Sequence, residues 1–143
     1  WSTLGYSLVS HNVGQNRLES LWVLKHDSVS LVSSSYDQQS ITLLTDISGH
    51  GISFTFVYTL NQYTGMLDLW SSLETTTLVR RQSWIIIGDF NSVLQLEDKT
   101  GSCFNRLAAS EFSACIDVCN LIEVPIKGAD FALRRYTLNG LQA

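Results

Sequence analysis

The segment that decides the fold runs from Trp84 to Asn91 and reads WIIIGDFN. Its first four residues form a continuous apolar run, which is typical of a β-strand buried on both faces. Asp89 and Asn91 are therefore predicted at the carboxyl end of a strand, where open α/β sheets place their functional sites. Residues two apart in an extended strand point to the same face, so we expect both side chains to converge on one ligand.

A carboxylate beside an amide suits the hydrolysis of a phosphate ester. Asp89 can take a proton from water or hold a divalent metal, and Asn91 can orient the water or hold a phosphate oxygen. Gly88 would let the backbone come close to the bound group. The same spacing also fits an Asx turn that only closes the strand, and the spacing by itself favours this simpler interpretation.

The sequence before this segment predicts several strands. Alternating or continuous apolar patterns indicate strands over residues 18–24, 28–34, 41–44 and 52–58. Turns are predicted at 25–27, because Lys-His-Asp follows the first run, and at 46–51, which contains two glycines. The 52–58 segment is the strongest of these predictions, because β-branched and aromatic residues dominate it.

Helical spacing of apolar residues predicts two helices and a parallel strand pair. One helix covers residues 64–79 and the other residues 105–119. We expect these residues of the second helix to face inward: Leu107, Phe112, Cys115, Ile116 and Cys119. The 64–79 helix would join parallel strands at 52–60 and 84–89, which makes this an α/β domain with Tyr58 and Asp89 at the same sheet edge. A weak final strand is expected at 136–138.

Composition narrows the class of protein. The chain has 143 residues, of which 45% are hydrophobic and 15% charged, and a formal net charge of -4. This apolar content excludes a disordered chain, and no apolar run approaches the roughly 20 residues of a membrane span. The acidic balance argues against nucleic-acid binding through a broad positive field. Three cysteines are too few for a disulfide framework, so Cys115 and Cys119 are expected to be reduced core residues and not half of a zinc site.

The pattern around the deciding segment resembles that of a known family. The run WIIIGDFNSVLQLEDKTG, residues 84–101, resembles the signature of the endonuclease/exonuclease/phosphatase superfamily, and most closely the endonuclease domain of plant LINE-type (non-LTR) retrotransposons. Those domains carry a Trp-x-x-x-Gly-Asp-Phe-Asn strand followed by Glu-Lys-x-Gly-Gly. The segment FVYTLN at 56–61 is similar to the family's Tyr-x-x-Asn strand end. Leu69-Trp70 resembles a Leu-Trp pair in its next helix, and RRYTLN at 134–139 resembles its Arg-Arg-Phe-Thr-Trp segment.

The resemblance implies a fold, an activity and a set of site residues. The fold would be a fragment of a four-layer α/β/β/α sandwich of the DNase I type, and the activity magnesium-dependent nicking of DNA to prime reverse transcription. Asp89 would activate or orient the attacking water, and Asn91 would share its metal and phosphate shell. Tyr58 would present its phenol to the scissile phosphate, with Asn61 adjacent. In the intact element the domain is fused to a reverse transcriptase and acts inside the cell, in the nucleus if functional.

Two of these residues have simpler interpretations, and the chain departs from the family pattern. Tyr58 could be a strand-end aromatic with a hydrated hydroxyl, and Asn61 a turn residue. The family's metal-binding glutamate would precede Trp1 and its Ser-Asp-His motif would follow Ala143. We therefore expect residues 1–143 to be a single partial domain that is inactive alone. The alternatives are a non-catalytic remnant or interaction module that keeps the fold, and another phosphatase of the superfamily.

Overall fold

The computed structural model describes residues 2–11, 21–94 and 105–124, which form a mixed α/β structure with two sheets and two α-helices. The elements in chain order are the 3₁₀ helix η1 (Ser2–Leu4), β1 (Tyr6–His11), β2 (Trp22–His26), β3 (Ser30–Tyr36), β4 (Ser40–Ile47), β5 (His50–Tyr58), α1 (Tyr63–Val79), β6 (Ser83–Asp89) and α2 (Arg106–Val118).

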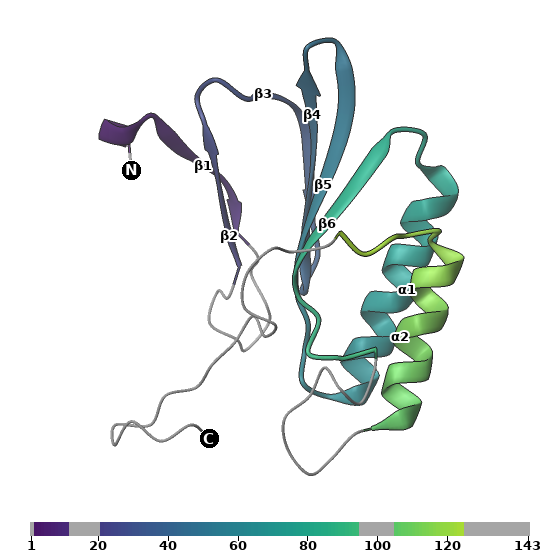
Figure 1. The fold of residues 1–143 in the computed structure, drawn as a ribbon. Coiled ribbons are helices and arrows are strands. Elements are labelled where there is room, and N and C mark those ends of the chain that lie inside the picture. The colour runs from purple at the N-terminus through teal and green to yellow at the C-terminus, as the bar shows by residue number, and fades with distance from the viewer. Residues whose placement is uncertain (1, 12–20, 95–104, 125–143) are drawn as a thin grey trace, which may run out of the picture.

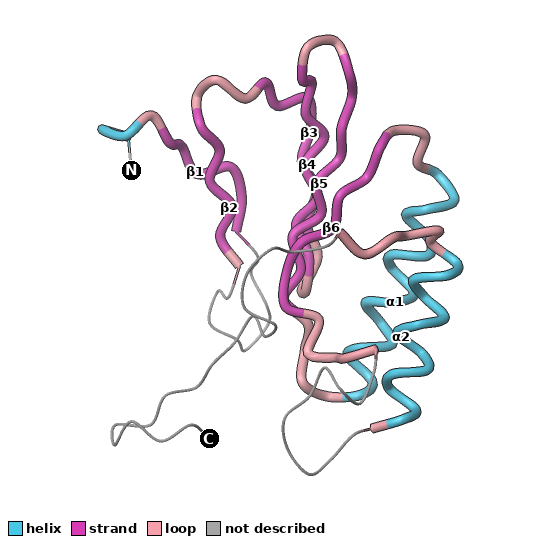
Figure 2. The backbone as a smooth tube through the Cα atoms, viewed as in Figure 1, coloured by secondary structure: helices cyan, strands magenta, loops and turns pink. Residues whose placement is uncertain are grey.

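The described elements lie in three layers. The four-stranded sheet has the order β3-β4-β5-β6, and the two-stranded sheet pairs β1 with β2. Both helices cover one face of the four-stranded sheet, and β1 and β2 lie on its other side (Figure 1). The tube drawing separates the strand layers from the helix layer in the same view (Figure 2).

The β5–α1–β6 unit confirms the predicted strand, helix and parallel strand. β5 pairs with β6 in parallel, and the register runs from Ile52 opposite Ser83 to Tyr58 opposite Asp89. β4 and β5 form an antiparallel hairpin. Its tip is the Ser48–Gly49 pair, and both residues have positive φ, as a two-residue hairpin loop requires. The hairpin tip and the Tyr58–Asp89 pair therefore mark opposite ends of the sheet.

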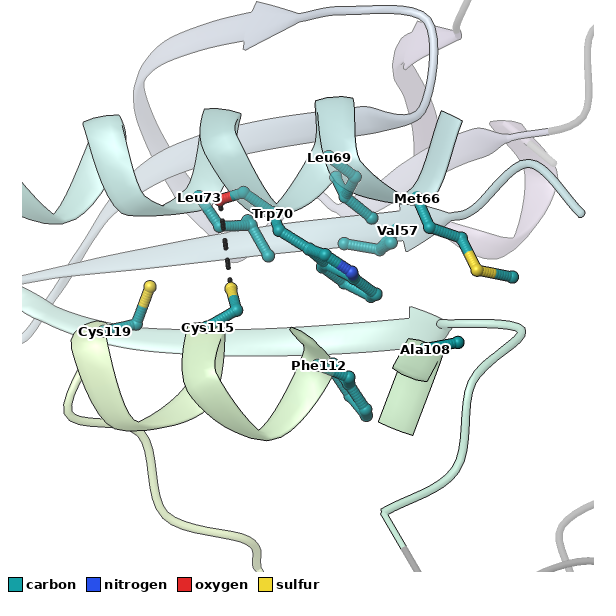
Figure 3. Close-up of a cluster of buried hydrophobic side chains, with 9 residues drawn as sticks. All are labelled: Val57, Met66, Leu69, Trp70, Leu73, Ala108, Phe112, Cys115 and Cys119. Carbon is teal, nitrogen blue, oxygen red and sulfur yellow. Dashed lines mark hydrogen bonds between the residues drawn. The ribbon is translucent and has the colours of Figure 1, made fainter. Parts of the chain in front are cut away.

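The main hydrophobic core lies between the helices and the sheet. α1 contributes Met66, Leu69, Trp70 and Leu73, which recur at helical spacing. They pack with residues of α2 and with Val57 of β5 (Figure 3). Trp70 stacks on Phe112 with ring centroids 4.8 Å apart. Trp84 is partly buried and packs against this core.

The second helix begins at a well-formed cap. The side-chain oxygen of Asn105 accepts hydrogen bonds from the N–H groups of Leu107 and Ala108, at 3.1 and 3.2 Å. These bonds satisfy two donors that have no partner within the first turn. Phe112, Cys115, Ile116 and Cys119 face the core as predicted. Leu107 does not, because it lies one position from the buried stripe and is 57% exposed.

A smaller core joins the two sheets. Val23 of β2 packs with Ile41 and Leu43 of β4, and Phe56 of β5 contacts this group. Alternate residues of β4 and β5 thus face opposite layers, which is the period of two expected of a strand between two packed layers. This cluster covers the β4 part of the face that is turned away from the helices.

The prediction that the 84–87 strand is buried on both faces is wrong for the described residues. Ile85 and Ile87 are 41% and 50% exposed, while Trp84 and Ile86 face the helices. The reason is topological, because β6 is one of the two outer strands of this sheet among the described elements, and the core between the two sheets includes no residue of β6. A continuous apolar run does not reveal whether both of its faces find partners.

Several predicted boundaries also change. The expected turn at 25–27 is only partly correct, because β2 continues through Lys25 and ends at His26. β4 and β5 run up to Ile47 and from His50, so the predicted 46–51 turn shortens to Ser48–Gly49. Strand β1 had no clear sequence signal. Residues 18–20, Cys103, the Lys99 segment and the predicted 136–138 strand lie outside the described residues.

Candidate functional site

The site is built around Phe90, which anchors the turn that follows β6. Its ring packs against Phe112 and Trp70, with centroids 5.1 and 6.1 Å away. Burying an aromatic side chain in this way holds the backbone on either side of it. Asp89 and Asn91 flank this anchor, so the core fixes the position of the Gly-Asp-Phe-Asn segment while these two polar residues remain outside the core.

Tyr58 and Asp89 are brought together by the sheet register. They are direct partners in the parallel β5–β6 pair, each at the carboxyl end of its strand. Partners in register point to the same face, here the face turned away from the helices. Both residues are half-buried. The sequence prediction that they share one edge of the sheet is confirmed.

Asn91 adopts a specific turn that ties the two strand ends together. Its main-chain N–H donates to Oδ1 of Asp89 at 2.9 Å, and its φ of 47° lies in the left-handed region that asparagine tolerates. Its side-chain Nδ2 donates to the carbonyl of Thr59 at 2.6 Å, and the Thr59 N–H donates to the Asp89 carbonyl at 2.9 Å. The Asx turn is therefore present, and it also reaches across to β5.

Thr59 lies at the centre of these contacts with one group unused. Its side chain is 1% exposed, and its hydroxyl has no hydrogen-bond partner among the described residues. A buried hydroxyl without a partner costs stability. Asn61 is different. It is exposed in the turn between β5 and α1, and within the described ranges no hydrogen bond joins it to Tyr58, Asp89 or Asn91.

Gly88 also has a role that the sequence analysis did not predict. The sequence suggests that it lets the backbone approach a bound group. In the structure its close neighbour is its register partner Val57, because an added Cβ would lie 2.8 Å from the Val57 main-chain nitrogen and would overlap its carbonyl oxygen. The φ of +155° adds to the preference for glycine. Gly88 therefore permits the close approach of β6 to β5 and so the register of Tyr58 with Asp89.

Gln39 is a residue of this region that the sequence analysis missed. It precedes β4, is 5% exposed, and uses both ends of its side-chain amide. Its Oε1 accepts from the Leu60 N–H and its Nε2 donates to the Gly65 carbonyl, each at 2.7 Å. From sequence alone, a glutamine at the start of a strand is usually predicted to face solvent. Its role emerges only when antiparallel pairing brings β4 beside the end of β5.

The oxygen atoms left free define what the site could hold. One Asp89 oxygen accepts from the Asn91 N–H, and the second has no hydrogen bond from the described part of the chain. Because Nδ2 of Asn91 is turned to Thr59, its amide oxygen remains available. Carboxylate and amide oxygens are suitable ligands for Mg²⁺, which keeps several waters and often binds through one or two side chains. Among residues 2–11, 21–94 and 105–124, no three His, Cys, Asp or Glu side chains gather into a metal-binding group.

Cys115 and Cys119 are buried free thiols, as predicted. Burial raises the pKa of Cys115 to about 12, and nearby Cys119 and Glu74 add to the effect. Because the thiolate is the form that binds metals, this thiol is a poor ligand at neutral pH. It contacts the Trp70 carbonyl at 3.9 Å and has a packing role between α1 and α2 (Figure 3).

Comparison with known proteins finds no family model and no curated protein that matches this chain. Neither described helix is long and apolar enough to cross a membrane.

Proposed function

We propose that this chain is part of a metal-dependent phosphodiesterase domain, similar to the DNA endonuclease domain of LINE-type retrotransposons. The observation that carries the proposal is the register of Tyr58 with Asp89 at the carboxyl ends of two parallel strands. Asn91 lies two residues after Asp89, and its side chain donates a hydrogen bond to the carbonyl of Thr59, the residue that follows β5. Three side-chain types that phosphate hydrolysis can use thus come from two separate segments to one edge.

Each residue would have a distinct part in the reaction. The free carboxylate oxygen of Asp89 would orient the attacking water and, with the amide oxygen of Asn91, hold a largely hydrated Mg²⁺. The metal would supply a positive charge to stabilise the developing charge on the phosphate oxygens. The Tyr58 hydroxyl would donate a hydrogen bond to one of those phosphate oxygens. Asn61 would approach the same phosphate from the exposed turn.

The finer fold belongs to the same proposal. The described elements form a layer of helices, a four-stranded sheet and a two-stranded sheet. These three layers would correspond to one α/β half of a four-layer α/β/β/α sandwich and to part of its second half. In the intact domain the substrate would be DNA, and a reverse transcriptase would be fused to it. In residues 1–143 the described site offers one carboxylate, so we propose that it binds the metal weakly and does not cleave.

Titration with Mn²⁺ tests the proposed metal site residue by residue. Mn²⁺ accepts the same oxygen ligands as Mg²⁺ and broadens the NMR signals of nearby amides. In dilute ¹⁵N-labelled protein we expect selective broadening of residues 58–61 and 88–92, with a dissociation constant on the order of millimolar. Excess Mg²⁺ should reverse it.

The matched control for this titration is Asp46. Its carboxylate also accepts a main-chain N–H in a turn, from Gly49 at 3.0 Å, but it lies at the hairpin end of the sheet. Asp89→Asn should abolish the selective broadening and Asp46→Asn should leave it intact. Broadening that survives in Asp89→Asn, or that spreads evenly over exposed carboxylates, would contradict the proposal. It would favour the non-catalytic alternative.

A further inference from the structure

The segment that carries Tyr58 and Asn61 is held in place from the opposite side of β5. Asp89 and Asn91 hold Thr59 from the β6 side. On the β4 side, Gln39 supplies hydrogen bonds to this segment. Its main-chain carbonyl accepts from the Tyr58 N–H at 2.9 Å, and its side chain reaches the turn beyond. The end of β5 is thus held between two groups of hydrogen bonds.

The side-chain amide of Gln39 has only one orientation that satisfies its partners. The Leu60 N–H requires an acceptor, and the Gly65 carbonyl requires a donor, so Oε1 and Nε2 cannot exchange places. A hydrogen-bonded and buried amide of this kind is expensive to displace. It fixes both ends of the turn from Leu60 to Gly65, and Asn61 lies inside that turn.

Two neighbouring features make this turn rigid. A Cβ at Gly65 would lie 2.7 Å from the Cβ of Leu60, so the first turn of α1 packs directly on the segment that follows β5. Gln39 is itself held by Asp37, whose Oδ1 accepts from the Gln39 N–H at 2.8 Å. The other Asp37 oxygen accepts from the hydroxyls of Ser40 and Ser72, at 2.9 and 3.3 Å. The support of the turn therefore extends to α1.

We infer that Gln39 is a positioning residue for the proposed phosphodiesterase site. It sets where Tyr58 and Asn61 stand relative to Asp89 and Asn91, and it does so without contacting the substrate or the metal. The inference rests on the proposed function. The position of the Tyr58–Asn61 segment affects activity only if this segment and the Asp89–Asn91 segment act on the same ligand.

The test compares two groups of amides in one Mn²⁺ titration. Gln39→Leu removes both side-chain hydrogen bonds and leaves the Asp89–Asn91 turn unchanged. We expect broadening at 88–92 to persist, and broadening at 58–61 to fall several-fold relative to it, because the effect decreases steeply with distance from the ion. Gln82→Leu changes an exposed glutamine and should leave this ratio unchanged.

The outcomes separate a positioning role from a purely structural one. If Gln39 only supports the fold, Gln39→Leu will lower the unfolding midpoint and leave the ratio of broadening at 58–61 to 88–92 unchanged, which would overturn the inference. No selective broadening in the parent protein would instead defeat the proposed function. If Gln39→Leu does not fold, Gln39→Glu replaces it, because this change keeps an acceptor for the Leu60 N–H and replaces the donor to the Gly65 carbonyl with a carboxylate oxygen that repels it. The same two outcomes decide it.

Discussion

The two ends of the four-stranded sheet each contain an aspartate that accepts a main-chain N–H in a turn, yet they differ in what surrounds it. At the hairpin end, Asp46 accepts from Gly49 and all residues from 46 to 51 are exposed. At the other end, Asp89 accepts from Asn91 beside a half-buried tyrosine and a buried threonine. The same local turn chemistry therefore closes a hairpin in one place and forms part of a candidate site in the other.

The difference comes from connectivity. A hairpin tip gathers residues adjacent in sequence, whereas the carboxyl ends of parallel strands bring together segments separated by a whole helix. At the site end, the chains that meet are the ends of β5 and β6 and the start of β4. Variants at matched positions of the two ends can test whether this convergence, and not the turn, makes the site distinct.

The largest difference in stability is expected between alanine substitutions at two glycines, one at each end of the sheet. Gly88→Ala places a Cβ against the Val57 backbone and should lower the free energy of unfolding by more than about 2 kcal/mol. Gly49→Ala meets no atom within 4 Å and strains only a φ of +83°, so it should cost about 1 kcal/mol. Urea denaturation followed by tryptophan fluorescence measures both. Equal losses would show that β5 and β6 are not in the close register described.

Two buried threonines are expected to change the free energy of unfolding in opposite directions when each is replaced by valine. The Thr59 hydroxyl has no hydrogen-bond partner in the described part of the chain, so Thr59→Val should raise the free energy of unfolding by about 1 kcal/mol. The Thr45 hydroxyl donates to the Ile52 carbonyl at 3.0 Å, and Thr45→Val should lower it by about 1 kcal/mol. The same denaturation experiment decides. A loss of stability in Thr59→Val would mean that its hydroxyl has a partner in solution.

These contrasts also indicate how much the sequence could predict. The Gly-Asp-Phe-Asn segment, the parallel strands and the Tyr58–Asp89 edge follow from local pattern and from the rule that a helix links parallel strands. Gln39 and Thr59 could not be found in this way, because their roles depend on contacts 21 or 32 residues away. The exposure of Ile85 and Ile87 was missed because an apolar run does not indicate how many layers cover it.

Substitutions at two exposed isoleucines are expected to have the smallest effect on stability. They should differ instead in how strongly they reduce association between copies of the chain. Ile87 lies on β6, an outer strand of the four-stranded sheet among the described elements, whereas Ile47 lies on β4, which is paired on both sides. Outer strands with exposed apolar residues promote association between chains. We expect the apparent mass by light scattering to rise with concentration. Ile87→Lys should reduce that rise more than Ile47→Lys, with stability changed by under about 0.5 kcal/mol in each.

A concentrated parent protein that remains monomeric would contradict that expectation. It would also show that the β6 face is protected in solution. If Ile47→Lys reduced association as much as Ile87→Lys, the outer-strand explanation would be wrong even though the chain associates.

We propose that the Tyr58–Asp89 edge carries one part of a phosphodiesterase site and not the complete catalytic set. Nicking of supercoiled plasmid by residues 1–143 with Mg²⁺ tests it most directly. Groups that act as a unit lose most of their effect when some are missing, so we predict no nicking above a protein-free control, and no difference between the parent and Asp89→Ala. Magnesium-dependent nicking that Asp89→Ala abolishes would contradict the claim, because a contaminating nuclease would not respond to that substitution.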